Sequence, residues 1–396
     1  MRWITVCGGG NGAHALVGTL LLRDQMAHIR LYLPLEDERR RFANALSSHS
    51  SFEVRVAGEV YSVASDRIRI TGDPEEAVLP PIIIMVVPAF AHGAILSQLA
   101  PYLTKKNTIA ALPARSGLEY QAQDILGNAD RNCCVLVGFQ TLPWACRIEE
   151  FGHLVTIHGT KNRVGAACLP GKEIEEKAEV LSTLLGMDVI SYQSMLELSL
   201  ANTGQLIHPG IMYSVFRNRL GEIFPSENEV PLFYASVDEA AAKVLSRMSD
   251  EVIAIKEVVE ERLPGLKMPG VVHLSRWLDE AYGEEIADTS SLARKFQTNQ
   301  GYQTFKVPVK KVNAGYRVDV ATRYLTEDVP FGLLVTKGIA LAVGGVETPM
   351  IDEVITNTSA WIGKEYLIDG ELIGRDVMGT RAPQRYTLDS LERLIR

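Results

Sequence analysis

Several features that would point to a membrane or nucleic-acid partner are scarce or missing in this sequence. No apolar run approaches the roughly 20 residues needed to cross a bilayer. Basic residues are not in excess, since Lys and Arg total 40 against 48 for Asp and Glu, a net charge of −8. We therefore expect no nucleic acid and no membrane as partner, because nucleic acids and anionic membranes both favour a basic surface.

Cysteine is also scarce, and its spacing lacks the pairs of metal and redox motifs. The five cysteines include no C-x-x-C pair, and Cys133 and Cys134 are adjacent within an apolar run. This usage is typical of reduced, mostly buried thiols in a cytosolic protein. The start of the chain has no charged segment followed by an apolar one, so no secretory signal is indicated. We expect a cytoplasmic protein without a bound metal.

The length and the hydrophobic pattern predict two domains. A chain of 396 residues exceeds the size at which one core usually stops growing. In the first half, short apolar runs alternate with helical patterns, and β-branched runs such as 82–87 suit strands buried on both faces of a parallel sheet. This alternation predicts an α/β, doubly wound domain of Rossmann type. Strands are expected at 3–6, 29–33, 82–87, 108–112 and 135–137, and helices at 12–23 and 36–46.

From about Glu197 onward the pattern is mainly helical. Ser236 and Glu239 have the spacing of a capping box, and a helical run follows that ends near 263–265. No internal repeat is evident. We therefore predict a dinucleotide-binding domain at 1–198 and a mainly α-helical substrate domain at 199–396.

A glycine-rich turn directly follows the first predicted strand. Gly8, Gly10 and Ala13 fit the pattern G-x-G-x-x-A, with Asn11 and Gly12 between them. In this pattern the glycines allow a tight turn and a close approach to pyrophosphate, and the helix N-terminus attracts its negative charge. The position between strand and helix favours dinucleotide binding over a simple tight turn.

The sequence favours NAD over NADP as the dinucleotide. Glu36 and Asp37 follow the second strand, where an acidic residue can bind the ribose 2′-hydroxyl. The arginines at 39–41 leave two alternatives, a site for a 2′-phosphate or a solvated helix face. Three residues after the strand at 82–87 are expected to pack beside the cofactor, because ligands bind at the carboxyl ends of such strands: Pro88, Ala89 and Phe90.

Longer strings in both halves resemble the opine dehydrogenases, and most of all the octopine, tauropine and alanopine dehydrogenases of marine invertebrates. The resemblance covers essentially the whole chain. The strings that carry it are VCGGGNGAH at 6–14, PAFAH at 88–92, TLPWACRI at 141–148, RYLTED at 323–328, GKEYL at 363–367 and PQRY at 383–386.

The resemblance implies a nucleotide-binding domain and a helical domain with the active site between them. It implies condensation of a 2-oxo acid such as pyruvate with the amino group of an amino acid or taurine, reduced by NADH, in a protein that is a monomer. By matching position, His208 is the acid/base, Asp328 its partner and Arg323 the anchor of the 2-oxo acid. Free imidazole titrates near pH ~6.5, and a guanidinium offers parallel donors to a carboxylate.

Two positions depart from the octopine-type pattern. Octopine-type members tend to have Glu at the place of Gln140 and Gln near the place of Arg115. With Trp144 and Cys146, these residues are predicted to contact substrate. Loss of a carboxylate and gain of a guanidinium would favour a neutral or anionic amine, such as glycine, alanine, β-alanine or taurine, unless the loop side chains face solvent.

Two other functions remain compatible with these residues. A 2-hydroxy-acid dehydrogenase would have the same nucleotide domain and would oxidise NADH with the 2-oxo acid alone. A nicotinamide-binding sensor would have no need of His208 and Asp328, yet the sequence has both. The strings in both halves favour the opine dehydrogenase, since the nucleotide-binding fold alone hosts many chemistries.

Overall fold

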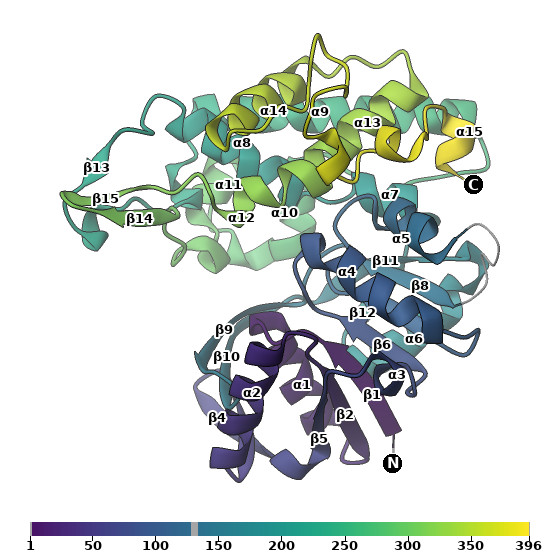
Figure 1. Cartoon of the computed structure of the whole chain (residues 1–396). Helices are drawn as coiled ribbons and strands as arrows, with labels where there is room; N and C mark the ends of the chain where they lie inside the picture. The colour runs from purple at the N-terminus through teal and green to yellow at the C-terminus, as the bar shows by residue number, and fades with distance from the viewer. Residues whose placement is uncertain (1, 128–133, 396) are drawn as a thin grey trace. The chain divides into compact units, whose positions relative to one another are not determined.

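The computed structural model describes residues 2–127 and 134–395. The chain divides into two compact units, Met1–Leu198 and Ser199–Arg396 (Figure 1). The first unit contains two β-sheets with helices, and the second is mainly helical. The predicted fold class, a doubly wound α/β domain followed by a helical domain, is confirmed.

The larger sheet of the first unit has eight strands within the described residues, and its central strands are parallel. Strand β1 pairs with β2 on one side and with β6 on the other, so that Thr5 lies opposite both Arg30 and Ile83. The two last strands run the opposite way, because β11 pairs antiparallel with β8. The spatial order is β12 (Asp188–Ser191), β11 (Arg163–Leu169), β8 (Val135–Phe139), β7 (Thr108–Ala111), β6 (Ile82–Met85), β1 (Arg2–Cys7), β2 (Ala27–Tyr32) and β5 (Ile68–Thr71).

Helices connect and cover these strands. Helix α1 packs against α6, whereas α4 packs against α3 and α5. The strands at the centre are apolar along their length, as in β7, where all four residues are buried, which is the pattern of a sheet covered on both faces. The helices of this unit are α1 (Asn11–Arg23), α2 (Glu36–Ser48), α3 (Pro74–Ala77), α4 (Ala89–Leu99), α5 (Leu118–Leu126) and α6 (Ile174–Leu185), with α7 (Met195–Leu200) at its end.

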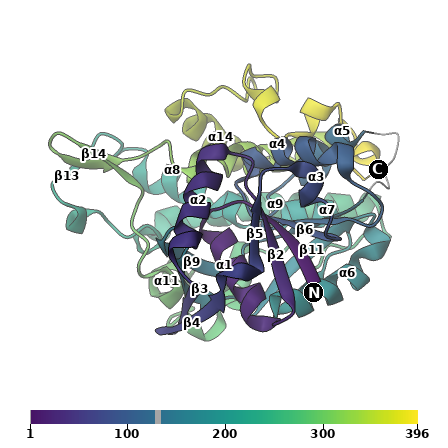
Figure 2. The same ribbon diagram turned by 60° about the horizontal axis from the view of Figure 1, so that its bottom comes forward.

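A second sheet lies on the other side of α1, and the sequence analysis did not predict it. Its order is β4 (Glu59–Ala64), β3 (Ser51–Val56), β10 (Leu154–Thr160) and β9 (Trp144–Glu150). Helix α1 contacts strands of both sheets (Figure 2). The approach is close at Gly18, where a Cβ atom would lie 2.1 Å from the Val54 side chain. A glycine is therefore required for α1 to pack on β3.

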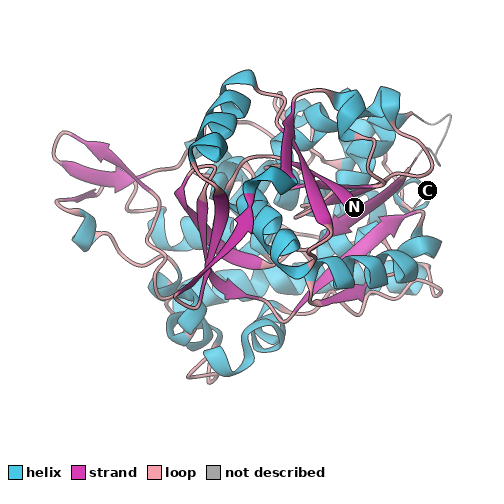
Figure 3. Ribbon diagram, turned by 90° about the horizontal axis from the view of Figure 1, so that it is seen from below, coloured by secondary structure: helices cyan, strands magenta, loops and turns pink. Residues whose placement is uncertain are grey.

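The second unit is built around the long helix α9 (Glu239–Arg262). Helix α9 packs against the other long helices of the unit, and a small sheet of β13 (Ile223–Phe224), β15 (Gly315–Val318) and β14 (Val309–Val312) projects from them (Figure 3). Those helices are α8 (Gly204–Phe216), α10 (Leu274–Tyr282), α11 (Leu292–Thr298), α13 (Leu334–Val343) and α14 (Pro349–Trp361), and two single turns are α12 (Arg323–Thr326) and α15 (Leu391–Leu394).

The predicted capping box of α9 is wrong, although the helix and its end near residue 263 are confirmed. The N-cap is Asp238, whose carboxylate accepts a hydrogen bond from the Ala241 amide at 2.8 Å. Ser236 instead donates to the Leu232 carbonyl. An aspartate caps as well as a serine, so the spacing alone could not choose between them.

Among the described residues no helix combines the length and the apolar character needed to cross a membrane.

Candidate functional site

The glycine turn lies where the strand order of the larger sheet changes direction. From β1 the chain proceeds outward through β2 and β5, then returns to β6 on the other side of β1. Helix α1 begins after the carboxyl end of β1, and α4 begins after that of β6. Two helix N-termini therefore meet the same edge, which is where doubly wound sheets bind dinucleotides.

Gly8 and Gly10 serve different purposes in this turn. Gly8 has φ +115°, and a Cβ atom there would lie 2.7 Å from the Val86 carbonyl oxygen of the neighbouring strand end. Gly10 is exposed, and a Cβ atom there would meet no described atom within 4 Å. Gly10 is also the N-cap of α1, and no described side chain caps this helix. The first backbone amides of α1 can thus donate to an anion, and the open space at Gly10 leaves room for that anion.

The other predicted cofactor residues divide into exposed and packed groups. Ala13 is fully buried, which allows α1 to lie close to the strand, and Gly12 is half-buried beside Val86. The side-chain oxygen of Asn11 accepts a hydrogen bond from the Ile148 amide of β9 at 2.9 Å, which holds this side chain against β9. An anion here would be bound by N–H donors, from the backbone or from the side-chain NH₂. At the start of α4, Pro88 is half-buried and Ala89 is buried.

Phe90 is exposed at this edge, with 63% of its surface accessible. It follows the N-cap of α4 by two positions, after the carboxyl end of β6. An exposed aromatic ring beside a predicted cofactor site is available for packing against a flat heterocycle. This exposure supports the prediction that Phe90 lies beside the cofactor.

The carboxyl end of β2 carries Glu36 and the three arginines. Glu36 is exposed in the first turn of α2. Arg39 donates to the carbonyls at 33 and 34, Arg40 pairs with Asp37 at 2.6 Å, and Arg41 lies over the Phe151 ring. Each arginine therefore has a partner within the protein.

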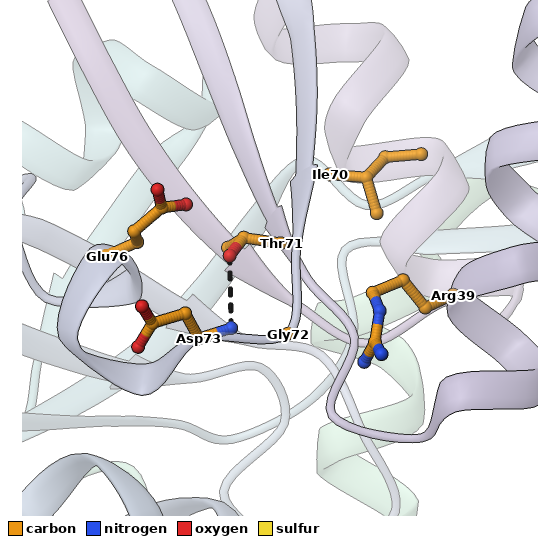
Figure 4. Close-up of a pocket in the computed structure, with 6 residues that line it drawn as sticks. All are labelled: Arg39, Ile70, Thr71, Gly72, Asp73 and Glu76. Atoms are coloured by element: carbon orange, nitrogen blue, oxygen red, sulfur yellow. Dashed lines mark hydrogen bonds between the residues drawn. The ribbon is translucent and has the colours of Figure 1, made fainter.

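A hollow of about 470 Å³ opens at the carboxyl end of β5 (Figure 4). Arg39 lies on one side, and the carboxylates of Asp73 and Glu76 lie on the other. Thr71 accepts a hydrogen bond from the Asp73 amide at 3.0 Å. Two carboxylates in this hollow accept hydroxyl groups but repel a phosphate, which favours the dinucleotide without a 2′-phosphate.

His208 and Asp328 meet in the second unit, as the sequence analysis expected. The Nδ1 atom of His208 donates to Asp328 Oδ2 at 2.7 Å. Asp328 is 1% exposed and His208 is 17% exposed at the side chain. A carboxylate only accepts hydrogen bonds, so this contact assigns the proton of the neutral ring to Nδ1 and leaves a lone pair on Nε2. The pair has the geometry of an oriented acid/base.

Two tyrosines complete this site, and the sequence analysis did not identify either. The hydroxyl of Tyr234 donates to His208 Nε2 at 3.1 Å, and the Tyr324 ring stacks on the imidazole with centroids 4.2 Å apart. Burial raises the pKa of Tyr234 well above its usual value, so its hydroxyl keeps its proton. Tyr324 lies within the string RYLTED at 323–328, whereas Tyr234 begins a short 3₁₀ helix, Tyr234–Ser236, where the sequence carries no functional motif.

Close helix packing brings these residues together. His208 lies in α8, and Asp328 precedes a kinked, π-type turn, Val329–Leu333. At Gly332 a Cβ atom would lie 2.6 Å from the Gln205 side chain of α8, so the turn reaches α8 only because it has glycine there. Irregular turns of this kind are frequent at functional sites.

Arg323 lies one short helix away from Asp328 and has an acidic partner. Its guanidinium donates through Nε to Glu327, which is 1% exposed, while the Arg323 side chain is 59% exposed. This ion pair neutralises a buried carboxylate. A guanidinium can bind on two edges, so the second edge is suited to a carboxylate ligand.

The four predicted substrate residues lie in the first unit. Arg115 follows β7 and Gln140 follows β8, two paired parallel strands, so both stand at the carboxyl edge of the sheet. Both are half-buried; Arg115 has φ +58°, and Gln140 accepts a hydrogen bond from the Tyr192 hydroxyl at 3.2 Å. At this edge the chain thus carries a guanidinium and a neutral amide.

Trp144 and Cys146, near the start of β9, show less evidence of a contact with substrate than Arg115 and Gln140 do. Trp144 is 5% exposed and belongs to the hydrophobic core of the unit. Cys146 is half-buried, and burial raises the pKa of its thiol to about 11. Cys146 is therefore a neutral thiol at physiological pH, and the burial of Trp144 favours a packing role. Cys133 lies outside the described residues, and Cys7, Cys134 and Cys168 are buried.

Comparison with known proteins finds close relatives over the whole chain. A family profile described as the α-helical domain of NAD/NADP octopine/nopaline dehydrogenases matches residues 191–362. Octopine dehydrogenase of Mizuhopecten yessoensis is 37% identical, with 99% of this chain and 98% of the relative covered. Tauropine dehydrogenase of Arabella iricolor is 32% identical, with 99% of each covered.

Solved structures are similar over the same length. Octopine dehydrogenase with NADH and L-arginine has a TM-score of 0.89 at 36% identity, and covers 100% of this chain and 98% of its own. The same enzyme with NADH and pyruvate has a TM-score of 0.87 at 34% identity and the same coverage. The similarity thus extends to both units.

Proposed function

The chain belongs to the opine dehydrogenase family, and we propose that it joins pyruvate, or a similar 2-oxo acid, to the amino group of a small neutral or anionic amine. It is an NAD-dependent oxidoreductase that acts on a CH–NH bond. The observation that carries the proposal is the buried pair of His208 and Asp328. The octopine dehydrogenase structures with NADH and pyruvate support the cofactor and the 2-oxo acid. The monomeric state and the cytoplasmic location stay predictions.

The cofactor's pyrophosphate is expected at the start of α1, against the backbone of Gly10, Asn11 and Gly12. The open space at Gly10 and the uncapped helix end fit this group. Glu36 is suited to the adenosine ribose, and the carboxylates in the hollow beside Arg39 favour NAD over NADP. The nicotinamide supplies the hydride when it is bound.

His208 is proposed to move the protons of the condensation. The amine must lose a proton before its nitrogen can add to the ketone carbonyl of the 2-oxo acid. The adduct then loses water to form the imine, which requires a proton on the departing hydroxyl oxygen. The Nε2 atom of His208 can carry such a proton, with Tyr234 holding this position until a substrate oxygen or nitrogen takes its place. Asp328 fixes the ring and stabilises the imidazolium that forms.

Arg323 is proposed to hold the carboxylate of the 2-oxo acid. Its Nε edge contacts Glu327, which fixes the plane of the guanidinium. The other edge presents parallel donors, and this geometry matches a carboxylate. Arg323 would therefore orient the substrate rather than take part in proton transfer.

The second substrate is proposed to be a small neutral or anionic amine rather than arginine. Arg115 adds a positive charge at the edge of the sheet, and Gln140 brings no negative charge to balance a second cation. Repulsion between two partly screened cations over several ångströms costs about 1–3 kcal/mol, which corresponds to about a 10- to 100-fold loss. A sulfonate or carboxylate would gain a partner instead.

We expect NADH oxidation with pyruvate to require an amine, and kcat/KM for at least one of taurine, β-alanine, glycine and alanine to exceed that for arginine by about 10-fold or more. The measurement follows absorbance of NADH with pyruvate and each amine in turn, with no amine as the control. Oxidation with pyruvate alone would indicate a hydroxy-acid dehydrogenase. A preference for arginine over all four would contradict the proposed substrate class and leave the reaction unchanged.

The double variant Arg115→Gln with Gln140→Glu should shift the preference toward arginine. It removes the cation and adds a carboxylate, so the ratio of kcat/KM for arginine to that for the preferred small amine should rise at least about 10-fold. Glutamine at 115 has the same difficulty with a positive φ as arginine, so the backbone is not newly strained. Arg115→Lys, which keeps the charge, is the matched control. An unchanged ratio would mean that these side chains do not face the amine substrate.

A further inference from the structure

Two histidines and a glutamate meet on the first unit, at the opposite end of β9 from Trp144. His49 is the C-cap residue of α2, Glu150 is the last residue of β9, and His153 lies in the turn before β10. One nitrogen or oxygen atom from each lies within 4.8 Å of the others. None of the three belongs to the candidate catalytic or cofactor residues.

One ion-pair contact and one ring stack hold the three side chains of the cluster together. His49 Nε2 lies 3.0 Å from Glu150 Oε1, and the two imidazole rings are stacked with centroids 3.6 Å apart. His153 Nδ1 donates to the Ser51 carbonyl at 3.0 Å, which leaves the lone pair on its Nε2 atom. Histidines that bind metal usually make such a second bond to a carbonyl.

The backbone around the cluster is fixed by its own hydrogen bonds. The His153 carbonyl accepts from the Glu53 amide of β3 at 2.7 Å, and the Gly152 amide donates to the Nε2 atom of His14 at 2.9 Å. Burial lowers the pKa of His14 to about 4, so this ring stays neutral and accepts. The turn is thus held in place before any ligand binds, and only side chains need to move.

We propose that His49, Glu150 and His153 bind a divalent transition metal, with Zn²⁺ as the best match. Two imidazoles and one carboxylate are a donor set typical of zinc, and a water can complete a tetrahedron. Two atoms that bind the same zinc ion at about 2.0–2.1 Å lie closer to each other than 4.8 Å, the limit within which these three ligand atoms lie. The stacked rings must therefore tilt so that both of their nitrogen atoms face the ion. His49 and Glu150 can rotate, since their side chains are 31% and 56% exposed.

Neighbouring charge favours a cation at this place. Glu53 Oε2 lies 3.8 Å from His153 Nε2, which adds a second carboxylate beside the proposed ligands. Mg²⁺ and Ca²⁺ prefer sites made of oxygen atoms, so the nitrogen donors select against them. The sequence analysis expected no metal from the lack of cysteine pairs. It could not find this cluster, because His49 lies about 100 residues before Glu150 and His153.

The test is isothermal titration of the chelator-treated full-length protein with ZnCl₂. We expect one Zn²⁺ per chain, with no competition from excess Mg²⁺, and binding at least about 100-fold weaker in His49→Gln, Glu150→Gln and His153→Gln. His158→Gln is the matched control, because this histidine is exposed on β10 of the same sheet but lies outside the cluster. It should bind zinc like the parent chain.

The visible absorption of bound Co²⁺ is a second measurement that identifies the ligands. Co²⁺ in a site of this kind should give visible absorption that is present in His158→Gln and lost in His49→Gln. Absence of zinc binding by the parent chain would overturn the proposal. Zinc that binds equally well in all three ligand variants would overturn it too, because the metal would then be held elsewhere, for example by a thiol.

Discussion

Replacing His208 by glutamine should lower kcat for reductive condensation by about 10²- to 10⁴-fold, the usual contribution of a positioned acid/base. Glutamine can still form hydrogen bonds with Asp328 and Tyr234, the two partners of the imidazole, but it cannot take up and release a proton. The variant therefore removes the proposed chemistry with little change in packing. The measurement is kcat at saturating NADH, pyruvate and amine.

Two controls separate chemistry from folding in this experiment. The glycine turn belongs to the first unit and His208 to the second, so the Kd for NADH, measured by its fluorescence, should stay within about twofold of the parent chain. Asp328→Asn should also lower kcat, because an amide can donate to Nδ1 and stabilise the wrong tautomer of the ring. If His208→Gln keeps kcat within a factor of a few, His208 is not the acid/base.

The parts of the fold that could be predicted from the sequence are those specified by neighbouring residues. The buried strands β6, β7 and β8 are short apolar runs, and the glycine turn follows β1 directly. The four-stranded sheet was missed because it pairs distant segments. Strand β3 pairs with β10 about 100 residues later in the chain, and β4 has one buried residue, Val63. No apolar run marks such a strand.

In the candidate site, too, some residues could be predicted from the sequence, whereas others depend on contacts between distant segments. His208 and Asp328 were predicted from the resemblance, and the structure brings them into contact although 120 positions separate them. Tyr234 could not be predicted, because a single tyrosine at the start of a short 3₁₀ helix has no spacing that marks it. The Asn11 side chain is a further example, since its bond to the Ile148 amide depends on the unpredicted strand β9.

Replacing Gly10 by valine should weaken NADH binding by about 10- to 100-fold or more while leaving the protein folded. Helix-start amides that bind pyrophosphate each contribute about 1.5–3 kcal/mol as hydrogen bonds to a charged group, and 1.4 kcal/mol corresponds to tenfold in Kd. A valine side chain would occupy the open space that the pyrophosphate needs. The backbone at Gly10 is extended, with φ −83° and ψ −174°, which valine adopts readily.

Comparison with Gly8 makes this prediction specific. An alanine at Gly8 would have to adopt a φ of +115°, and its Cβ atom would lie 2.7 Å from the Val86 carbonyl oxygen. Gly8→Ala should therefore lower Tm, whereas Gly10→Val should leave Tm nearly unchanged. Gly265→Val is the matched control, because a Cβ atom there also meets no described atom within 4 Å and the residue lies in the second unit. It should bind NADH normally. Normal NADH binding by a folded Gly10→Val variant would place the pyrophosphate away from the start of α1, because the valine side chain and the phosphates cannot share that space.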